Sequence, residues 1–256
     1  MRTDMDLHLH TALIGCANET MSVPALLQRC EQEGITTIAI TDHLNRPDQL
    51  PTHLAIKQQL REYQGPVQIT WGVEANVADP ATGELTITPE QVEEAGFELV
   101  IAGVHASYYT EPDVPGIVDL QHRLMMAVVQ SPLVDVLVHP WWFGRGEFES
   151  GVMAWMTTLE AWPEAQIREL GQAARETGTA IEMNADAIIT NGQYGPAFQE
   201  DYKRVFGILL EEGAKFTTGS DAHSINQVGS SKLAAQYLAE IGATDEDLLV
   251  PAPTRL

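Results

Sequence analysis

The segment Asp6-Leu7-His8-Leu9-His10 combines a strand-like pattern with two histidines at its carboxyl end. Because alternate residues of a strand point to the same face, His8 and His10 are expected to lie side by side. Six later apolar runs also end in ligand-type residues: 35–40 in Thr41-Asp42-His43, 69–73 in Glu74, 99–104 in His105, 133–138 in His139, 180–183 in Asn184 and 216–220 in Asp221-Ala222-His223. In α/β barrels the carboxyl ends of the strands hold the chemistry, so the repetition predicts a multi-metal site on one rim.

Helix-type segments alternate with these runs along the whole chain. They are expected at 23–33, 50–63, after Thr88, and at 117–129, 163–177, 197–212 and 230–241. Such alternation predicts βα units around a parallel sheet, and continuous apolar strands indicate burial on both faces. A length of 256 residues suits one α/β barrel, so we expect a single domain over residues 1–256.

The charge of the chain restricts its partners. Asp and Glu number 36 against 14 Lys and Arg, which gives a net charge of −22. Such a field disfavours DNA, RNA or an anionic membrane as the main partner, although bound cations can still attract a small phosphate. The sequence contains neither a transmembrane stretch nor a signal-type segment, and its two cysteines do not indicate a disulfide framework. We therefore expect a cytoplasmic protein.

The histidines are distributed unevenly. Six of the eight follow predicted strands, whereas His53 and His122 fall inside predicted helices and are expected to have ordinary roles. Glu74 and Asp221 add carboxylate oxygens, and a carboxylate among imidazoles can bridge two metals about 3.5–4 Å apart. Closure of a barrel would place the first and last strands together, so their ligand residues would converge.

The motifs D-L-H-L-H-T, I-T-D-H, G-V-E, G-V-H, L-V-H-P and G-S-D-A-H, in this order, resemble the polymerase-and-histidinol-phosphatase (PHP) family. The resemblance extends from Asp6 to about His223. It implies a distorted (β/α)7 barrel, TIM-like in form, with two or three metal ions at the carboxyl-terminal rim of the strands. It also implies an enzyme that hydrolyses phosphoester bonds.

The resemblance also implies which residues bind each ion. The first ion would take His8, His10, Glu74 and Asp221. The second would take Glu74, as the bridge, with His105 and His139. The third would take His43 and His223, but where the family commonly has a further histidine this chain has Cys16. A thiolate can replace imidazole on zinc; alternatively, Cys16 is a buried cysteine and the third ion is weak or absent.

Other polar residues near the rim are expected to support the site. Asp6, Asp42, Glu182 and Asn184 are interpreted mainly as structural residues behind the ligands. Arg145, between two glycines, is a candidate for contact with phosphate, and the alternative is a solvated arginine. Arg46 is a second candidate, and Ser107 and Tyr108 are expected to line the pocket.

The aromatic-rich insert at 141–160 is expected to form either a lid over the pocket or a packed cap on the barrel.

The working hypothesis is metal-dependent hydrolysis of a small soluble phosphate ester, either a monoester or a diester. A hydroxide between the first two ions would be the nucleophile. Asp221, His223 and metal-bound water are alternatives for the general acid, and Arg145 would help to neutralise charge at phosphorus. Zinc, manganese and iron all suit this ligand set.

Three rival functions stay open on the sequence alone. The first is a carbon–nitrogen hydrolase with a carbamylated lysine, but none of the four lysines ends a predicted strand. The second is a nuclease or nucleotide phosphatase, for which the acidic charge leaves only short nucleotides as substrates. The third is a non-catalytic metal-binding module.

Overall fold

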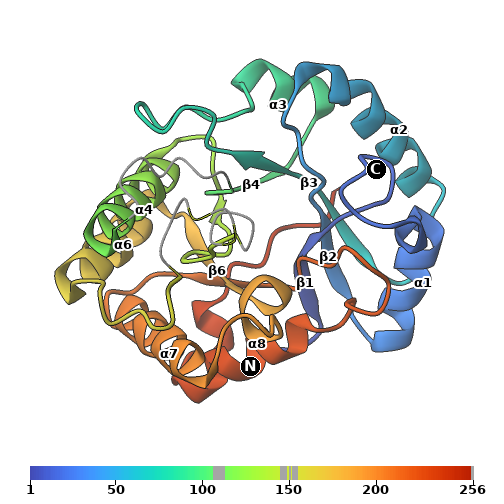
Figure 1. Ribbon diagram of the computed structural model, residues 1–256. Coiled ribbons are helices and arrows are strands. Elements are labelled where there is room, and N and C mark those ends of the chain that lie inside the picture. Colours follow the sequence, from blue (N-terminus) through green and yellow to red (C-terminus); the bar gives the residue numbers. More distant parts are fainter. Residues whose placement is uncertain (106–112, 145–148, 150, 152–154, 255–256) are drawn as a thin grey trace.

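The computed structural model describes residues 1–105, 113–144, 149, 151 and 155–254. Their strands form one parallel sheet in the order β1-β2-β3-β4-β5-β6-β7, which curves into a nearly closed barrel (Figure 1). The strands are β1 Met5–Leu9, β2 Thr37–Ile40, β3 Gln68–Asn76, β4 Leu99–Gly103, β5 Val136–Leu137, β6 Ala180–Asn184 and β7 Phe216–Gly219. The expected distorted (β/α)7 barrel is therefore confirmed.

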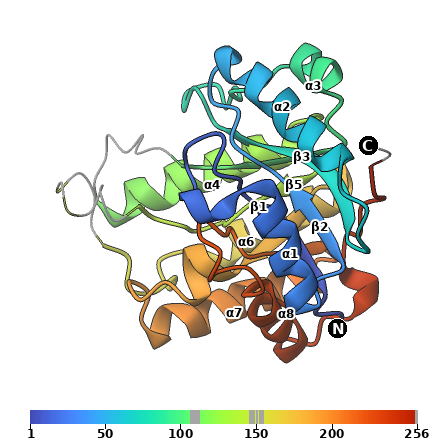
Figure 2. The ribbon, with the colours of Figure 1, turned by 90° about the vertical axis from the view of Figure 1, so that its right-hand side faces the viewer.

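Helices surround the barrel on its outside (Figures 1 and 2). They are α1 Val23–Glu33, α2 Leu50–Arg61, α3 Pro89–Ala95, α4 Val114–Gln130, α6 Glu164–Thr177, α7 Pro196–Glu211 and α8 Ser231–Glu240. Shorter helical turns are η1 Glu19–Met21, η2 Pro47–Gln49, η3 Ala185–Ile189 and η4 Asp245–Asp247. Their starts follow local rules: Thr88 and Gln91 form a capping box at α3, which ends at Gly96. None of the described helices is long and apolar enough to span a bilayer.

The first and last strands meet, as barrel closure requires. Leu9 and Ala222 form a parallel bridge just beyond β1 and β7. The amide of Asp221 donates to the carbonyl of His8 at 2.9 Å, and the Thr218 hydroxyl donates to the carbonyl of Met5 at 3.0 Å. These contacts bring the ligand-type residues after β7 next to those at the end of β1.

The carboxyl-terminal segment closes the opposite end of the barrel. The amide of Leu249 donates to the carbonyl of Phe216 at 2.8 Å, at the start of β7. Thr254 continues across the sheet, where its amide donates to the carbonyl of Ile69 and its hydroxyl accepts from the amide of Trp71. The segment therefore joins the amino ends of β7 and β3.

Strand β5 is shorter than the apolar run 133–138 predicts. Residues before it form a turn, in which the amide of Val134 donates to the carbonyl of Ser131. The side chain of Asp135 accepts from the amide of Val100 at 2.8 Å, so a carboxylate replaces part of the usual ladder. Beyond Leu137 the chain soon turns away, because His139 has a φ of 30°. The ligand position is kept although the strand is brief.

Candidate metal centre

Glu74, on β3, stands at the centre of the rim, and its two oxygens face different histidines. Its Oε1 lies 2.9 Å from Nε2 of His105 and 3.2 Å from Nε2 of His139. Its Oε2 lies 3.2 Å from Nε2 of His8, 3.3 Å from Nε2 of His10 and 3.1 Å from Nδ1 of His43. A carboxylate placed in this way has the arrangement of a bridge between two ligand groups.

Asp221 joins the group on the Oε2 side. Its Oδ1 lies 3.2 Å from Nε2 of His10 and 3.5 Å from Nε2 of His8. The backbone of Asp221 has a φ of 58°, a left-handed conformation that costs about 1–3 kcal/mol in a non-glycine residue. We call the convergent set the inner cluster; it consists of His8, His10, Glu74, His105, His139 and Asp221.

The chemistry of the inner cluster fits divalent cations. Nε2 of His8, Nε2 of His10 and Oε2 of Glu74 are buried and make no hydrogen bond within the described part of the chain. Leaving such groups without partners is costly unless another species satisfies them. Imidazole nitrogens with carboxylate oxygens are donors that zinc, iron and manganese accept. Within the cluster, donor atoms of His8, His10 and Glu74 lie within 4.8 Å of one another.

Burial and neighbouring charges set the protonation of these groups. Burial opposes ionisation of Glu74, but the neighbouring histidines, led by His43 and His8, hold its pKa well below the usual range. Burial lowers the pKa of His10, and it lowers the pKa of His43 to about 3, so these two imidazoles can offer lone pairs at neutral pH. Burial opposes protonation of His8 and His139 as well, but the carboxylates beside them outweigh it and raise both pKa values, so an ion would displace a proton from these two.

Glu182, on β6, holds two ligand residues from behind. Its Oε1 lies 2.8 Å from Nδ1 of His8, and its Oε2 accepts from the backbone amide of His139 at 2.8 Å. The contact places the proton of His8 on Nδ1 and leaves Nε2 directed at Glu74. Gly219 makes room for it, because a Cβ at that position would lie 1.9 Å from Oε1 of Glu182. This agrees with a structural role for Glu182.

Asp6 and Asp42 brace the backbone of the rim. Oδ1 of Asp6 accepts from the amide of Ser220 at 2.8 Å, and Oδ1 of Asp42 accepts from the amide of Thr11 at 2.7 Å. Burial raises the pKa of each carboxyl to about 7. Their contacts are with loops that carry ligands, which matches the supporting role expected for them. Asn184, likewise expected to be structural, caps η3 through the amide of Ala187.

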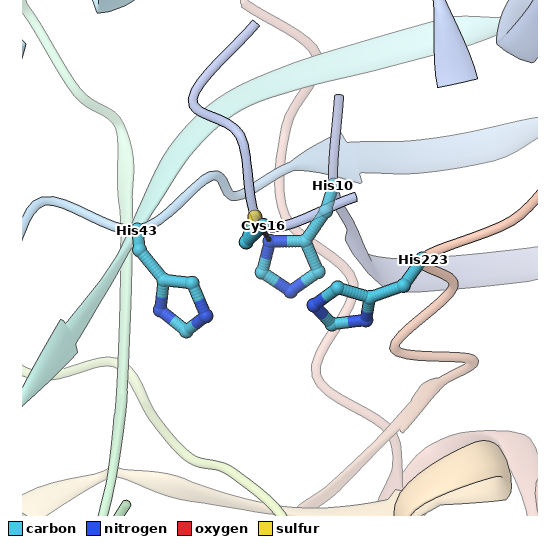
Figure 3. Close-up of side chains that lie close together, drawn as sticks. All are labelled: His10, Cys16, His43 and His223. Carbon is cyan, nitrogen blue, oxygen red and sulfur yellow. Dashed lines mark hydrogen bonds between the residues drawn. The ribbon is translucent and has the colours of Figure 1, made fainter. Parts of the chain in front are cut away.

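A second set, the outer cluster, consists of Cys16, His43 and His223. Figure 3 shows these side chains gathered beside His10. The sulfur of Cys16 lies 3.8 Å from Nδ1 of His10, and one donor atom from each of the four residues lies within 4.8 Å of the others. Burial raises the pKa of the Cys16 thiol to about 12, to which the charges of Asp42 and Glu74 also contribute.

The two helical histidines lie outside both clusters. His53, in α2, donates from Nε2 to the carbonyl of His43 at 3.0 Å, so it supports the outer cluster from behind. His122, in α4, pairs with Glu169 at 3.0 Å. Neither is a ligand candidate, as the sequence suggests.

A pocket of about 300 Å³ opens over the clusters. Its lining includes five expected residues of the rim: His43, His105, His139, Asp221 and His223. Asp186, Asn191 and Gln227 also line it but are not anticipated by the sequence interpretation. Asp186 and Asn191 follow β6, so the rule about carboxyl ends of strands is a signal that could identify them; Gln227 has no such signal.

The insert after β5 contributes both to the core and to the pocket. Trp141 is fully buried and packs against Tyr202 and Phe206, with ring centroids 6.5 and 6.3 Å away. Trp142 instead lines the pocket, 5.7 Å from the ring of His139. The described part of the insert is thus partly an aromatic cap and partly a pocket wall.

Of the two arginines expected to contact phosphate, only Arg46 lies within the described residues. Arg145 lies outside the described residues, as do Ser107 and Tyr108. Arg46 is on the surface, with a side chain that is 70% exposed and paired with Asp48. Among the described residues, those that line the pocket include no lysine or arginine.

Comparison with known proteins identifies the family. The model of the PHP domain matches residues 6–137, just over half of the chain. The chain belongs to the PHP family. The match covers β1 to β5, whereas His139, Asp221 and His223 come from the remainder of this PHP protein.

Relatives extend the similarity to nearly the whole length. A protein of Vibrio atlanticus, named a probable phosphatase, is 26% identical and covers 99% of this chain and 91% of its own. "Probable phosphatase YcdX" of Escherichia coli is 24% identical, with 98% and 91% covered. A candidate histidinol phosphatase from Listeria monocytogenes has a similar structure, with a TM-score of 0.57, 16% identity, and coverage of 88% and 97%. This last similarity shows a common fold.

Proposed function

We propose that this PHP protein hydrolyses a phosphoester bond in a small phosphorylated substrate, with divalent metal ions held on both sides of Glu74. The observation that carries the proposal is the division of the Glu74 oxygens: Oε1 faces His105 and His139, whereas Oε2 faces His8, His10 and His43. Family membership and the phosphatase names of two relatives support hydrolysis of phosphoesters. A pocket of about 300 Å³ favours a small ester over a long chain.

The ligands divide between two inner positions. His8, His10 and Asp221 would hold one ion with Oε2 of Glu74, and His105 and His139 would hold the other with Oε1. When bound, such paired ions lower the pKa of water toward about 7 and neutralise charge on phosphoryl oxygens. We assign manganese, zinc or iron to these positions, since the donors are nitrogen and carboxylate oxygen.

The other residues of the pocket would position the substrate. Trp142 offers an aromatic wall beside His105 and His139, while Asp186, Asn191 and Gln227 offer polar atoms to the alcohol portion. Asp221 and His223 line the same pocket. Burial opposes ionisation of Asp221, but the neighbouring histidines, led by His8, hold its pKa below the usual range, so its carboxylate suits a metal ligand and not a proton donor. His223 stays a prediction for the proton donor only where it binds no ion. Arg145 stays a prediction for phosphate contact.

We also propose that residues 1–256 form one hydrolase domain. Strands β6 and β7, which follow the part matched by the family model, complete the same sheet as β1 to β5. They also bring Glu182 and Asp221 to the ligands that come from the first half.

The test is hydrolysis of a panel of phosphoesters by protein reconstituted with manganese, zinc or iron, measured as release of phosphate from monoesters and as release of the alcohol from diesters. We expect release that a chelator abolishes, and a loss of more than about a hundredfold in His105→Ala, because removing a ligand should exceed the effect of removing a group behind one. His122→Ala is the matched control, since His122 pairs with Glu169 away from the pocket. Full activity in His105→Ala, or release that persists in chelator, would reject the proposal.

A further inference from the structure

Cys16 lies where three histidines of the rim meet. Figure 3 shows its sulfur beside His10, with ring nitrogens of His43 and His223 turned toward the same space. One donor atom from each of these four residues lies within 4.8 Å of the other three. Sulfur and imidazole nitrogen at such spacing form the donor set of a mixed Cys/His zinc site.

We propose that Cys16 is a thiolate ligand of a further metal ion, which it holds together with His43 and His223, and that its sulfur makes this outer position prefer zinc. The proposal rests on the proposed function, because it adds to the ions beside Glu74. His10 is assigned to the inner cluster, since its Nε2 lies 3.3 Å from Glu74 and 3.2 Å from Asp221.

The loop that carries Cys16 is fastened to the segments that carry the two histidines. At its start, the amide of Thr11 donates to Oδ1 of Asp42, the residue before His43, at 2.7 Å. At its end, the amide of Asn18 donates to the carbonyl of His223 at 2.9 Å. These two bonds hold the backbone of the Cys16 loop beside the segments that carry both imidazoles.

Further contacts tighten this loop. Gly15 has a φ of 89°, which glycine adopts without strain, and it makes the turn that precedes Cys16. The hydroxyl of Thr20 accepts from the amide of Ile225 at 3.1 Å, a second connection to the segment after β7. A preorganised position of this kind reduces the cost of ordering a ligand when the ion arrives.

Each of the two histidines, His43 and His223, has one ring nitrogen that can bind an ion. Nδ1 of His223 donates to the carbonyl of Asp221 at 2.9 Å, which leaves its Nε2 with a free lone pair. Nδ1 of His43 lies 3.1 Å from Oε2 of Glu74, so this imidazole would offer its Nε2 to the outer position. Its backbone is held by His53, whose Nε2 donates to the carbonyl of His43 at 3.0 Å. Ligand histidines are commonly fixed by such contacts behind them.

The donor sets explain the preference for zinc. The inner cluster includes carboxylates of Glu74 and Asp221, whose oxygens suit manganese as well as zinc. The outer group has no carboxylate among its described donors, so a thiolate would supply its negative charge. Soft sulfur ligands select zinc over harder ions such as manganese. One rim would therefore contain positions of two chemical kinds.

The competing interpretation is that Cys16 only orients His10. Its sulfur lies 3.8 Å from Nδ1 of His10, within the range of a weak hydrogen bond. In that case the thiol would bind no metal, and its replacement would act through His10 on the inner cluster.

Cobalt reconstitution distinguishes the two. A cobalt–thiolate bond gives a near-ultraviolet charge-transfer absorption that cobalt with nitrogen and oxygen ligands lacks. We expect the band in the wild-type protein and in Cys30→Ala, the control for the other cysteine, which is a buried residue of α1. The band should be absent in Cys16→Ser and in Cys16→His. A wild-type protein without the band, or a band that survives in Cys16→Ser, would overturn the proposal.

Metal content gives a second, independent readout. Zinc-loaded Cys16→Ser should lose one equivalent of zinc, and Cys16→His should recover it but bind manganese and zinc with less discrimination than the wild type. Unchanged zinc content in Cys16→Ser would show that sulfur is only a partner of His10. Phosphate release without a cobalt–thiolate band would reject this inference alone, whereas a band without release from any ester would reject the proposed function alone.

Discussion

The inner and outer clusters of the rim are built in different ways. His8 and Glu74 lie within β1 and β3 and are completely buried, and Glu182 holds His8 from behind. By contrast, Cys16 and His223 lie on loops, and the side chain of His223 is 37% exposed. The positions of His8 and Glu74 are thus set by the sheet itself, whereas those of Cys16 and His223 depend on hydrogen bonds between loops.

This difference indicates at which positions of the site the ligand residue can be replaced. A ligand on a buried strand shares its position with the core, so a change there disturbs packing and charge together. A ligand on a tethered loop can change its chemistry while the barrel stays intact. Cys16, the departure from the family pattern, occurs on the side where the fold permits it.

The largest effect should come from Glu74→Gln. An amide cannot offer two anionic oxygens to the two sets of histidines, so both inner positions should lose their ions. We expect a fall in phosphate release well beyond the about 10–100-fold typical of residues behind a ligand. Metal analysis together with kinetics would check it. If this variant kept its full metal content, Glu74 would not be a bridge, and the distinction between a bridged inner cluster and an independent outer one would be wrong.

Gly219→Ala should be the next most harmful. A Cβ there would lie 1.9 Å from Oε1 of Glu182 and 2.6 Å from Cβ of His8, so the ligand must move. We expect destabilisation by about 1–3 kcal/mol, measured by urea unfolding, with reduced metal content. Gly207→Ala in α7 is the control, since a Cβ there meets nothing within 4 Å. Equal stability of both variants would contradict tight packing of Glu182 and His8 against Gly219.

Glu182→Gln tests the support behind the ligands. Gln can keep one acceptor but cannot accept from both His8 and the amide of His139 as a carboxylate does. We expect metal affinity at the inner positions to fall by about 10–100-fold, as chelator competition would measure. The cobalt–thiolate absorption of the outer position should persist. If the outer position weakened equally, the two clusters would have to be treated as one unit.

The last prediction concerns the effect of pH on stability through Asp42, whose side chain holds the start of the Cys16 loop at Thr11. Burial raises its pKa from 3.8 to about 7 in the native, metal-free protein. Between these values the native state holds a proton that the unfolded state has released, so stability falls as pH rises. The fall is at most about 1.4 kcal/mol per pH unit for one proton. Urea unfolding between pH 4 and 7 should show a shallower decline in Asp42→Asn; identical slopes would show that Asp42 does not titrate there.

The strand-borne part of the site could be predicted from sequence, because short-range periodicity determines it. The i, i+2 spacing of His8 and His10 and the position of Glu74 after an apolar run depend only on strand geometry. The same spacing at Asp221 and His223 misleads: β7 ends at Gly219, and Asp221 is left-handed. The local sequence pattern does not indicate this turn, because the turn is held by a hydrogen bond across the barrel. In this bond the amide of Asp221 donates to the carbonyl of His8.

Contacts between distant loops were also beyond prediction. The pocket residue Gln227 reaches the rim through the segment after β7, and no motif marks it; Asp186, in η3, has only the general signal that it follows a strand. For Cys16 the sequence left two alternatives, and the choice depends on the tethers from Thr11 and Asn18. Such long-range hydrogen bonds join residues far apart in the chain, so they leave no periodic signal.

Trp142 gives the protein an optical probe of its own site. Its indole lies 5.7 Å from the ring of His139 and 6.0 Å from that of His105, whereas Trp71 and Trp141 are sealed in the core. A paramagnetic ion beside those two imidazoles quenches indole emission at this range, while zinc does not. Loading of the second inner position can therefore be followed by fluorescence in unlabelled protein, in real time and separately from turnover.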